Sequence, residues 1–201
     1  PIVGTVFIIL IFLCNLAYAF LARWYAVLHS GVKGERRLFR TVKKLHGTNI
    51  VFHNLPVRYK RGRSELDMLI VCHAGVLIIE VKNHSGTISG SWRDDKWTQR
   101  KHYRDGKVTE TMMDNPIKQM RRQRDIVKSI LTAAGENVWI DSVLYFSSPN
   151  AKLKISLRES DYVCCESAEL LEFLKSYDSG ETLSKSRMEH IAQILRESSG
   201  V

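Results

Sequence analysis

The sequence predicts an α/β domain from about residue 31 to the end of the chain, preceded by one transmembrane helix. Short apolar runs of strand length alternate with amphipathic helical patterns, and this interleaving is typical of α/β domains. Residues 2–22 contain no charged side chain, and about 20 apolar residues are enough to cross a bilayer core as a helix. The 201 residues suffice for one domain of ordinary size and such an appendage.

The apolar run is the first element, and we assign it to a transmembrane anchor over residues 1–28. A secretory signal peptide is the alternative, because Ala17-Tyr18-Ala19 resembles a cleavage site. No Lys or Arg precedes the run and many follow it, which favours an uncleaved anchor with its C-terminal side in the cytoplasm. We therefore expect a single-pass inner (plasma) membrane protein, held by residues 2–22 and the adjacent basic residues, with residues 31–201 as a cytoplasmic domain.

Helices and strands follow one another along this domain. An amphipathic helix is expected over residues 34–46, ended by Gly47. Asn115 and Pro116 begin a second helix that runs to about Ala134, because Asn caps helices and Pro suits the first helical position. The other expected elements are strands at 50–57, 66–72, 76–81, 86–90, 138–148 and 162–165, a polar hairpin or loop at 91–114, and closing helices at 167–177 and 184–196.

The net charge of +9 is concentrated near the start of the domain. Residues 23–63 contain eleven Lys or Arg against the single acid Glu35. Next to the anchor, such a block suits anionic lipid headgroups, and farther along it suits nucleic acid. The residues expected to bind nucleic acid are Arg58, Lys60, Arg61 and Arg63. The four cysteines include no C-x-x-C pair, so the sequence indicates neither a zinc site nor a disulfide framework.

Apart from Glu65 at its edge, the apolar run "SELDMLIVCHAGVLIIEVK" at residues 64–82 is interrupted by three charged side chains, those of Asp67, Glu80 and Lys82. If a two-residue turn joins the two strands in this run, Asp67 lies opposite Glu80 or Lys82. Residues two apart on a strand share a face, so all three side chains would converge at one end of one face. A three-residue loop with a bulge would break this convergence.

Two carboxylates this close in an apolar strand pair repel each other, unless a divalent cation neutralises them. Oxygen ligands favour Mg²⁺ or Mn²⁺ over zinc, and such a metal can activate water for phosphodiester cleavage. The alternative is structural, because Glu80 and Lys82 can form an ordinary ion pair on one face of a strand.

A series of motifs between Gly34 and Leu131 carries a resemblance to a known family. In order they are "GER" followed by Leu, "LDMLIV", "GVLIIEVKNHSGTISG", a Trp and "NPIKQ". This series resembles the nuclease-related domain, NERD, which is assigned to the PD-(D/E)xK restriction-endonuclease-like superfamily. The resemblance covers about residues 34–131 and implies a restriction-endonuclease-like mixed β-sheet core flanked by helices. Residues 136–201 are then expected to form a C-terminal α/β extension.

The resemblance also implies roles for individual residues. Asp67 and Glu80 would ligate the metal, with the Val81 carbonyl as a third ligand. Lys82 would position or help deprotonate the attacking water.

Two further residues complete the implied catalytic set. Glu35 would support the metal site from the first helix, although an acid in a first turn is also favoured by the helix dipole. Gln119 would reach in from the second helix, where it shares a helical stripe with Gln123. A capping or surface amide is the alternative for Gln119.

These residues predict a membrane-anchored, metal-dependent nuclease that hydrolyses DNA phosphodiester bonds at the cytoplasmic face. The alternative is a non-catalytic, membrane-tethered module of the same fold that binds nucleic acid or a protein partner through its basic segment. A third reading is a structural membrane protein in which the two acids and the lysine only form ion pairs.

Overall fold

The computed structural model describes residues 2–45 and 47–199, and within the first helix the side chains of residues 2–9, 23 and 26–30 lie outside the described part. The elements are, in chain order, α1 (Ile2–Val42), β1 (Ile50–Tyr59), β2 (Gly62–Cys72), β3 (Gly75–Lys82), β4 (Gly86–Ser91), β5 (Lys96–His102), β6 (Val108–Asp114), α2 (Pro116–Ala133), β7 (Ile140–Phe146), β8 (Ala151–Ser156), β9 (Tyr162–Cys164), α3 (Ser167–Ser176) and α4 (Lys185–Ser199).

The described strands form two sheets. Sheet A has the order β1-β2-β3-β7-β9, and sheet B has the order β6-β5-β4-β8. In sheet A, β1, β2 and β3 are antiparallel neighbours, whereas β7 runs parallel to both β3 and β9. Because parallel neighbours need a crossover, the chain leaves β3, builds most of sheet B and returns through α2 to β7.

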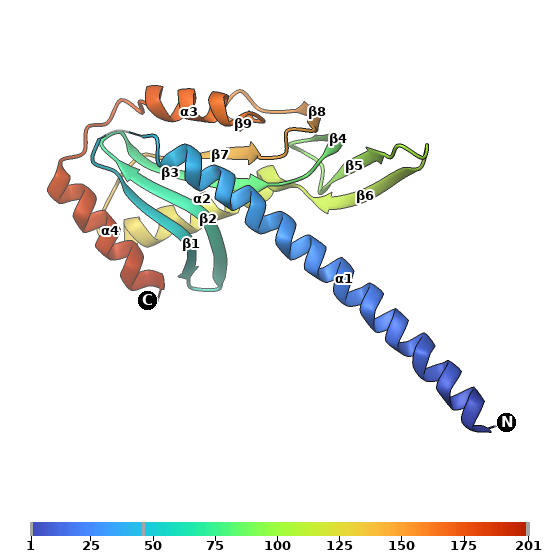
Figure 1. Ribbon diagram of the computed structural model, residues 1–201. Helices are drawn as coiled ribbons and strands as arrows, with labels where there is room; N and C mark the ends of the chain where they lie inside the picture. Colours follow the sequence, from blue (N-terminus) through green and yellow to red (C-terminus); the bar gives the residue numbers. More distant parts are fainter. Residues whose placement is uncertain (1, 46, 200–201) are drawn as a thin grey trace.

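Helices cover both faces of sheet A, as Figure 1 shows. On one face, α2 and α4 enclose a core that includes Leu69 and Ile78, and on the other face α1 and α3 enclose Ile70 and Ile79. The strands β2 and β3 are therefore buried on both faces, which explains their long apolar runs. A third cluster joins sheet B to the start of α2 around the fully buried Trp97.

The turn between β2 and β3 sets the register that the candidate site needs. Cys72 pairs with Gly75 and Met68 with Ile79, so the connection is a two-residue turn, as one of the sequence alternatives requires. The next pair in this register is Asp67 and Glu80. Gly75 has a φ of 124°, and a Cβ there would come within 2.8 Å of the Trp139 carbonyl oxygen, so only glycine fits this turn.

The fold class predicted from the sequence included a transmembrane helix, and this part of the prediction is wrong. No helix in the described part of the chain is long and apolar enough to cross a membrane. Of the uncharged run at residues 2–22, residues 2–9 have side chains outside the described part, and the remainder is shorter than the roughly 20 residues that a span needs. The predicted localisation, a single-pass plasma-membrane protein with a cytoplasmic C-terminal domain, rested on that helix and is overturned with it.

The expected helix at residues 34–46 proves to be the end of the longer α1, which runs from Ile2 to Val42 without interruption. His46 lies outside the described residues. The second half of α1 packs on sheet A through Leu38 and Val42, whereas its first half extends away from the sheets with apolar side chains such as Phe12 and Leu16 exposed (Figure 1).

The expected mixed β-sheet core flanked by helices is present as sheet A, and further strands form a second sheet, sheet B. The polar hairpin expected at residues 91–114 is confirmed as β5 and β6, but it belongs to sheet B. The sequence prediction missed β8, which pairs parallel with β4 and completes this second sheet. The observed architecture is thus a mixed α/β fold with two sheets, compatible with a nuclease-like domain.

Candidate active site

Side chains from four elements meet in a cleft of about 490 Å³ at the carboxyl end of β3. Glu35 comes from α1, Asp67 from β2, Glu80 and Lys82 from β3, and Gln119 from α2. The fold therefore brings together all five residues of the catalytic set that the sequence analysis assembled from separate segments. The two-residue turn and the parallel return through α2 are the features that make them neighbours.

Glu80 is almost fully buried, with 2% of its surface exposed, and both of its carboxylate oxygens accept hydrogen bonds. Its Oε1 accepts from the Lys82 ammonium at 2.6 Å and from the Gln119 amide at 2.7 Å. Its Oε2 accepts from the Gln123 amide at 2.7 Å. A buried carboxylate is stable only when paired in this way, so the side chain is held in one position.

Lys82 and Gln119 also bind each other, which closes a three-membered network around Glu80. The Lys82 Nζ lies 3.0 Å from the Gln119 Oε1, while the Gln119 amide nitrogen donates to Glu80. Gln119 lies in the first turns of α2, and the buried Asn115 fixes the start of that helix by accepting a hydrogen bond from the Ile117 N–H. The capped helix therefore sets the position of the amide next to the acid.

Asp67 has a pKa well above the ordinary value of an aspartic acid. Its Oδ2 accepts a hydrogen bond from the Val81 N–H at 2.7 Å, which favours the ionised form. Burial nevertheless raises the pKa of Asp67 from 3.8 to about 7, and the neighbouring charge of Glu80 acts in the same direction. The nearby charge of Lys82 lowers this pKa but does not offset the effects of burial and of Glu80.

Glu35 faces the cleft from α1 and makes one long hydrogen bond, 3.5 Å, to the Asn54 amide. Asn54 has a positive φ of 47°, and it stands opposite Asp67 at an interruption in the β1–β2 ladder. Because this carboxylate is not held tightly, it is available to a ligand in the cleft. It also adds negative charge that raises the pKa of Asp67.

The donors that could hold a metal here are all oxygens, and this composition suits Mg²⁺ or Mn²⁺. Among the described residues, no group of three or more His, Cys, Asp and Glu side chains is arranged to hold a metal ion. Protein ligation would therefore rest on Asp67, Glu80 and a backbone carbonyl, for which Val81 is the sequence candidate. Lys82 already binds Glu80 Oε1 at 2.6 Å, so Glu80 would share its charge between this ammonium and a metal held at the site.

The basic residues expected to bind nucleic acid lie at the tip of the β1–β2 hairpin. Arg58 pairs with Arg63 across the hairpin, and Lys60 and Arg61 form its turn, with Lys60 at a φ of 52°. All four side chains are exposed. Ser64 and Glu65 come directly after Arg63 in β2, and both line the acidic cleft. The basic tip therefore lies beside the candidate site.

Two residues near the acids were not in the predicted set. Gln123 is fully buried, and its amide nitrogen binds both Glu80 and the Glu65 carbonyl oxygen. Among the described residues its own Oε1 finds no hydrogen-bond partner, so this oxygen can accept a bond from a bound water. Arg122 also lines the cleft. The signal for Gln123 was present in the sequence, as an amide one turn after Gln119 on an otherwise apolar stripe.

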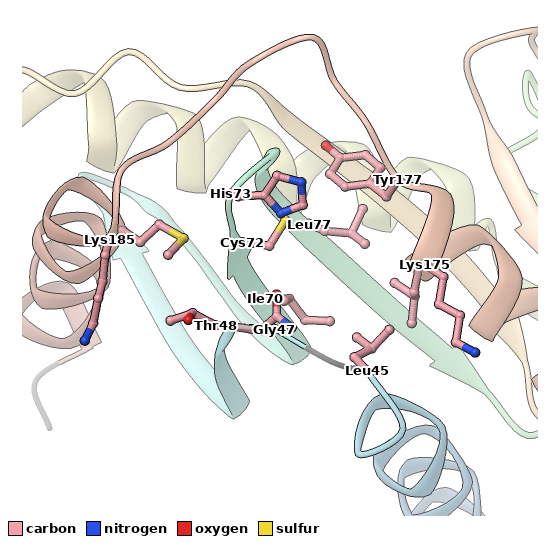
Figure 2. Close-up of a pocket in the computed structure, with 13 residues that line it drawn as sticks. Leu45, Gly47, Thr48, Ile70, Cys72, His73, Leu77, Lys175, Tyr177 and Lys185 are labelled. Atoms are coloured by element: carbon pink, nitrogen blue, oxygen red, sulfur yellow. The ribbon is translucent and has the colours of Figure 1, made fainter.

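A larger cavity of about 590 Å³ lies elsewhere, between the β2–β3 turn, α3 and the start of α4. Figure 2 shows His73, Leu77 and Tyr177 around it, together with the two lysines Lys175 and Lys185. Its described lining contains no carboxylate, and burial raises the pKa of the Cys72 thiol, which makes this thiol a poor nucleophile. The smaller acidic cleft is therefore the better candidate for hydrolytic chemistry.

Comparison with known proteins gives a family match and one informative relative. A family model described as "Nuclease-related domain" (NERD) matches residues 30–147. An uncharacterized protein of Bacillus anthracis is 34% identical over 71 residues, which cover 34% of this chain and 34% of that protein. The chain thus aligns with about a third of this relative's length. No solved structure gives a significant match.

Proposed function

The chain belongs to the nuclease-related domain family, and from this premise we propose that it is a metal-dependent nuclease that hydrolyses DNA phosphodiester bonds in the acidic cleft. The observation that carries the proposal is the convergence of Asp67, Glu80 and Lys82. Two carboxylates in a largely buried setting, one with its pKa raised to about 7, are costly to keep unless they bind a cation.

The chemistry follows from the properties of these groups. A Mg²⁺ or Mn²⁺ ion held by Asp67 and Glu80 would supply charge stabilisation and a more acidic bound water. Lys82 contacts Glu80 directly, and its hydrogen bonds to Glu80 and Gln119 keep its ammonium at the cleft. Its role is to orient the attacking water or to stabilise the negative charge that develops on the phosphate.

Gln119 and Gln123 act through Glu80. Each amide donates to a different oxygen of this carboxylate, so together they fix its plane without adding charge. Such fixation favours a single productive geometry for the group that Glu80 binds.

DNA is proposed as the substrate because the cleft adjoins the exposed basic tip formed by Arg58, Lys60, Arg61 and Arg63. When a protein binds nucleic acid without sequence preference, contacts from Lys and Arg to the phosphates supply most of the affinity. A tip that binds backbone phosphates would hold the polymer next to the acids.

The decisive experiment is DNA cleavage by the full chain with Mg²⁺ or Mn²⁺, compared with the same reaction in a chelator. The Asp67→Asn variant is expected to lose at least about a hundredfold in rate, because it removes a metal ligand. Asp105→Asn is the matched control, since that carboxylate is exposed and lies in the turn between β5 and β6, outside the cleft lining. Cleavage by Asp67→Asn at the wild-type rate would exclude the assigned site.

A non-catalytic binding module is the second candidate, and one observation favours it. The Lys82 ammonium already neutralises Glu80 at 2.6 Å, so the network is closed without a metal. This candidate predicts salt-sensitive DNA binding that is unchanged by chelator and by Asp67→Asn, with no cleavage under any metal condition. Charge reversal at the hairpin tip would then weaken binding more than any change at the acids.

A further inference from the structure

Arg122 occupies a junction between two depressions on the surface of α2. It lines the acidic cleft together with Asp67 and Glu80. It also lines a groove of about 450 Å³ between the tip of the β1–β2 hairpin and α2, where Tyr59 and Lys118 are among its neighbours. We call this second depression the hairpin groove. A strand lying along it would enter the acidic cleft past Arg122.

The guanidinium of Arg122 differs from the other cations around the two depressions because nothing in the described part of the chain binds it. Lys82 is engaged by Glu80, Lys118 by Asp95, and Arg121 by both oxygens of Asp161. Arg122 is exposed. An Arg without a structural partner, placed at the mouth of a site with four acids, has its full hydrogen-bonding capacity left for a ligand.

The charge balance of the cleft explains why a cation is needed there. Glu35, Glu65, Asp67 and Glu80 all line the cleft, and Lys82 offsets only one of them. A phosphodiester entering this space meets net negative charge, and even a bound divalent ion leaves the acids unbalanced. A planar guanidinium can bind two phosphate oxygens at once, which an ammonium cannot do with fixed geometry.

The hairpin groove has the lining that a nucleic-acid strand requires. Tyr59 and Ile126 line the groove, and Lys60, which is not part of the lining, lies over the Tyr59 ring at 5.4 Å from its centroid. Basic and aromatic groups side by side suit a chain of phosphates and bases. The two depressions share Arg122, so the lining is continuous from the hairpin to the acids.

From these observations we propose that Arg122 binds a backbone phosphate of the DNA strand and guides that strand from the hairpin groove into the acidic cleft. The inference rests on the nuclease function proposed above and extends it to the path of the substrate. Arg122 is a positioning residue in this scheme, because the chemistry belongs to the acids and Lys82.

The test measures binding of a fluorescent single-stranded oligonucleotide of about 16 nucleotides to the full chain in chelator, where no metal-dependent cleavage occurs. Arg122→Gln is expected to weaken binding roughly tenfold to a hundredfold, the range for a lost hydrogen-bonded charge. The dependence of log affinity on log salt should become shallower by about one. Arg122→Lys should keep this salt dependence and recover part of the affinity, which a merely structural role would not produce.

Arg124→Gln is the matched control, because it removes the same charge from the same helix at a position that lines a different cleft. It should bind about as wild type does. Equal affinity of Arg122→Gln and wild type, or no binding by wild type, would overturn the inference. Cleavage assays run in parallel separate failure of this inference from failure of the proposed function. If Arg122→Gln binds and cleaves DNA as wild type does while Asp67→Asn loses metal-dependent cleavage, the nuclease proposal stands and only the role of Arg122 is excluded.

Discussion

Asp67 shows how a single side chain links the stability of the fold to its proposed chemistry. Its carboxylate is buried beside Glu80, and both effects raise its pKa from 3.8 to about 7. An acid whose pKa is raised on folding binds more protons in the folded state than in the unfolded state. Between about pH 4 and pH 7, the free energy of unfolding therefore falls as the pH rises, and above this window the penalty is complete.

We therefore predict that Asp67→Asn makes the chain more stable at about pH 8 and leaves it nearly unchanged near pH 4. The expected gain at the higher pH is roughly 1–3 kcal/mol, because the uncharged amide removes a buried negative charge. Urea unfolding at several pH values measures this difference. An identical pH profile for wild type and variant would contradict the assigned environment of Asp67.

A bound metal should also change how the free energy of unfolding depends on pH. If Asp67 and Glu80 bind Mg²⁺, the ion offsets their repulsion, so it should stabilise wild type more at about pH 8 than at about pH 5. The stabilisation should be absent in Asp67→Asn.

At the scale of elements, α2 decides whether the site assembles, because it carries Gln119, Arg122 and Gln123. Asn115 ties its first turn to the loop after β4. The side-chain oxygen of Asn115 accepts from the Ile117 N–H, and its amide donates to the Ser91 and Asp94 carbonyl oxygens. The residue is 2% exposed, so these groups have no water to replace the lost partners.

We predict that Asn115→Ala lowers the free energy of unfolding by about 2 kcal/mol and also weakens DNA cleavage, because the helix that positions Gln119 loses its anchor. Asn115→Asp keeps the acceptor but loses every hydrogen bond that the amide donates and places a negative charge beside carbonyl oxygens. It should therefore be no more stable than Asn115→Ala at neutral pH. The exposed Asn150→Ala is the control, with a change within about 0.5 kcal/mol expected in urea unfolding.

The elements also show which parts of the fold could be read from the sequence. The β2–β3 hairpin was predictable because its two apolar runs are separated by a short turn. A two-residue turn fixes the register of the strands, and this register places Asp67 opposite Glu80. The start of α2 was predictable because Asn115 and Pro116 are a local capping signal. The catalytic set could be assembled because these local signals are strong on each of its segments.

The failures have physical causes too. The strand β8, with the sequence Ala-Lys-Leu-Lys-Ile-Ser, alternates apolar and polar residues as a strand with one half-buried face does, so its local signal was present in the sequence, whereas its parallel pairing with the distant β4 was not. The sequence could not show that α1 continues from the apolar run into the domain, because a helical pattern does not reveal whether two adjacent helical segments are one. Arg122 carried no signal, since a single Arg on a helix is usually an exposed solubilising residue.

At the scale of the whole molecule, the family match ends at residue 147, whereas the core does not. The segment after it adds β9 to the edge of sheet A and lays α4 against β1 and α2. Ile191 and Leu195 of α4 are fully buried in the same cluster as Leu69 and Ile78. The backbone N–H of Leu183 also donates to the His73 carbonyl oxygen in the β2–β3 turn. The C-terminal quarter of the chain is therefore part of the support beneath the acids.

This dependence predicts two different ways of losing activity. Ile191→Asp places an unpaired charge in the core and should lower the free energy of unfolding by more than about 3 kcal/mol, so cleavage and the cooperative unfolding transition are lost together. Asp67→Asn should lose cleavage while the transition persists, because its effect is confined to the cleft. Gln193→Asp on the exposed face of α4 controls for the added charge. If the Ile191→Asp chain unfolded as cooperatively and as late in urea as wild type, α4 would not be needed to hold sheet A, and the support of the site would have to come from α1 and α2 alone.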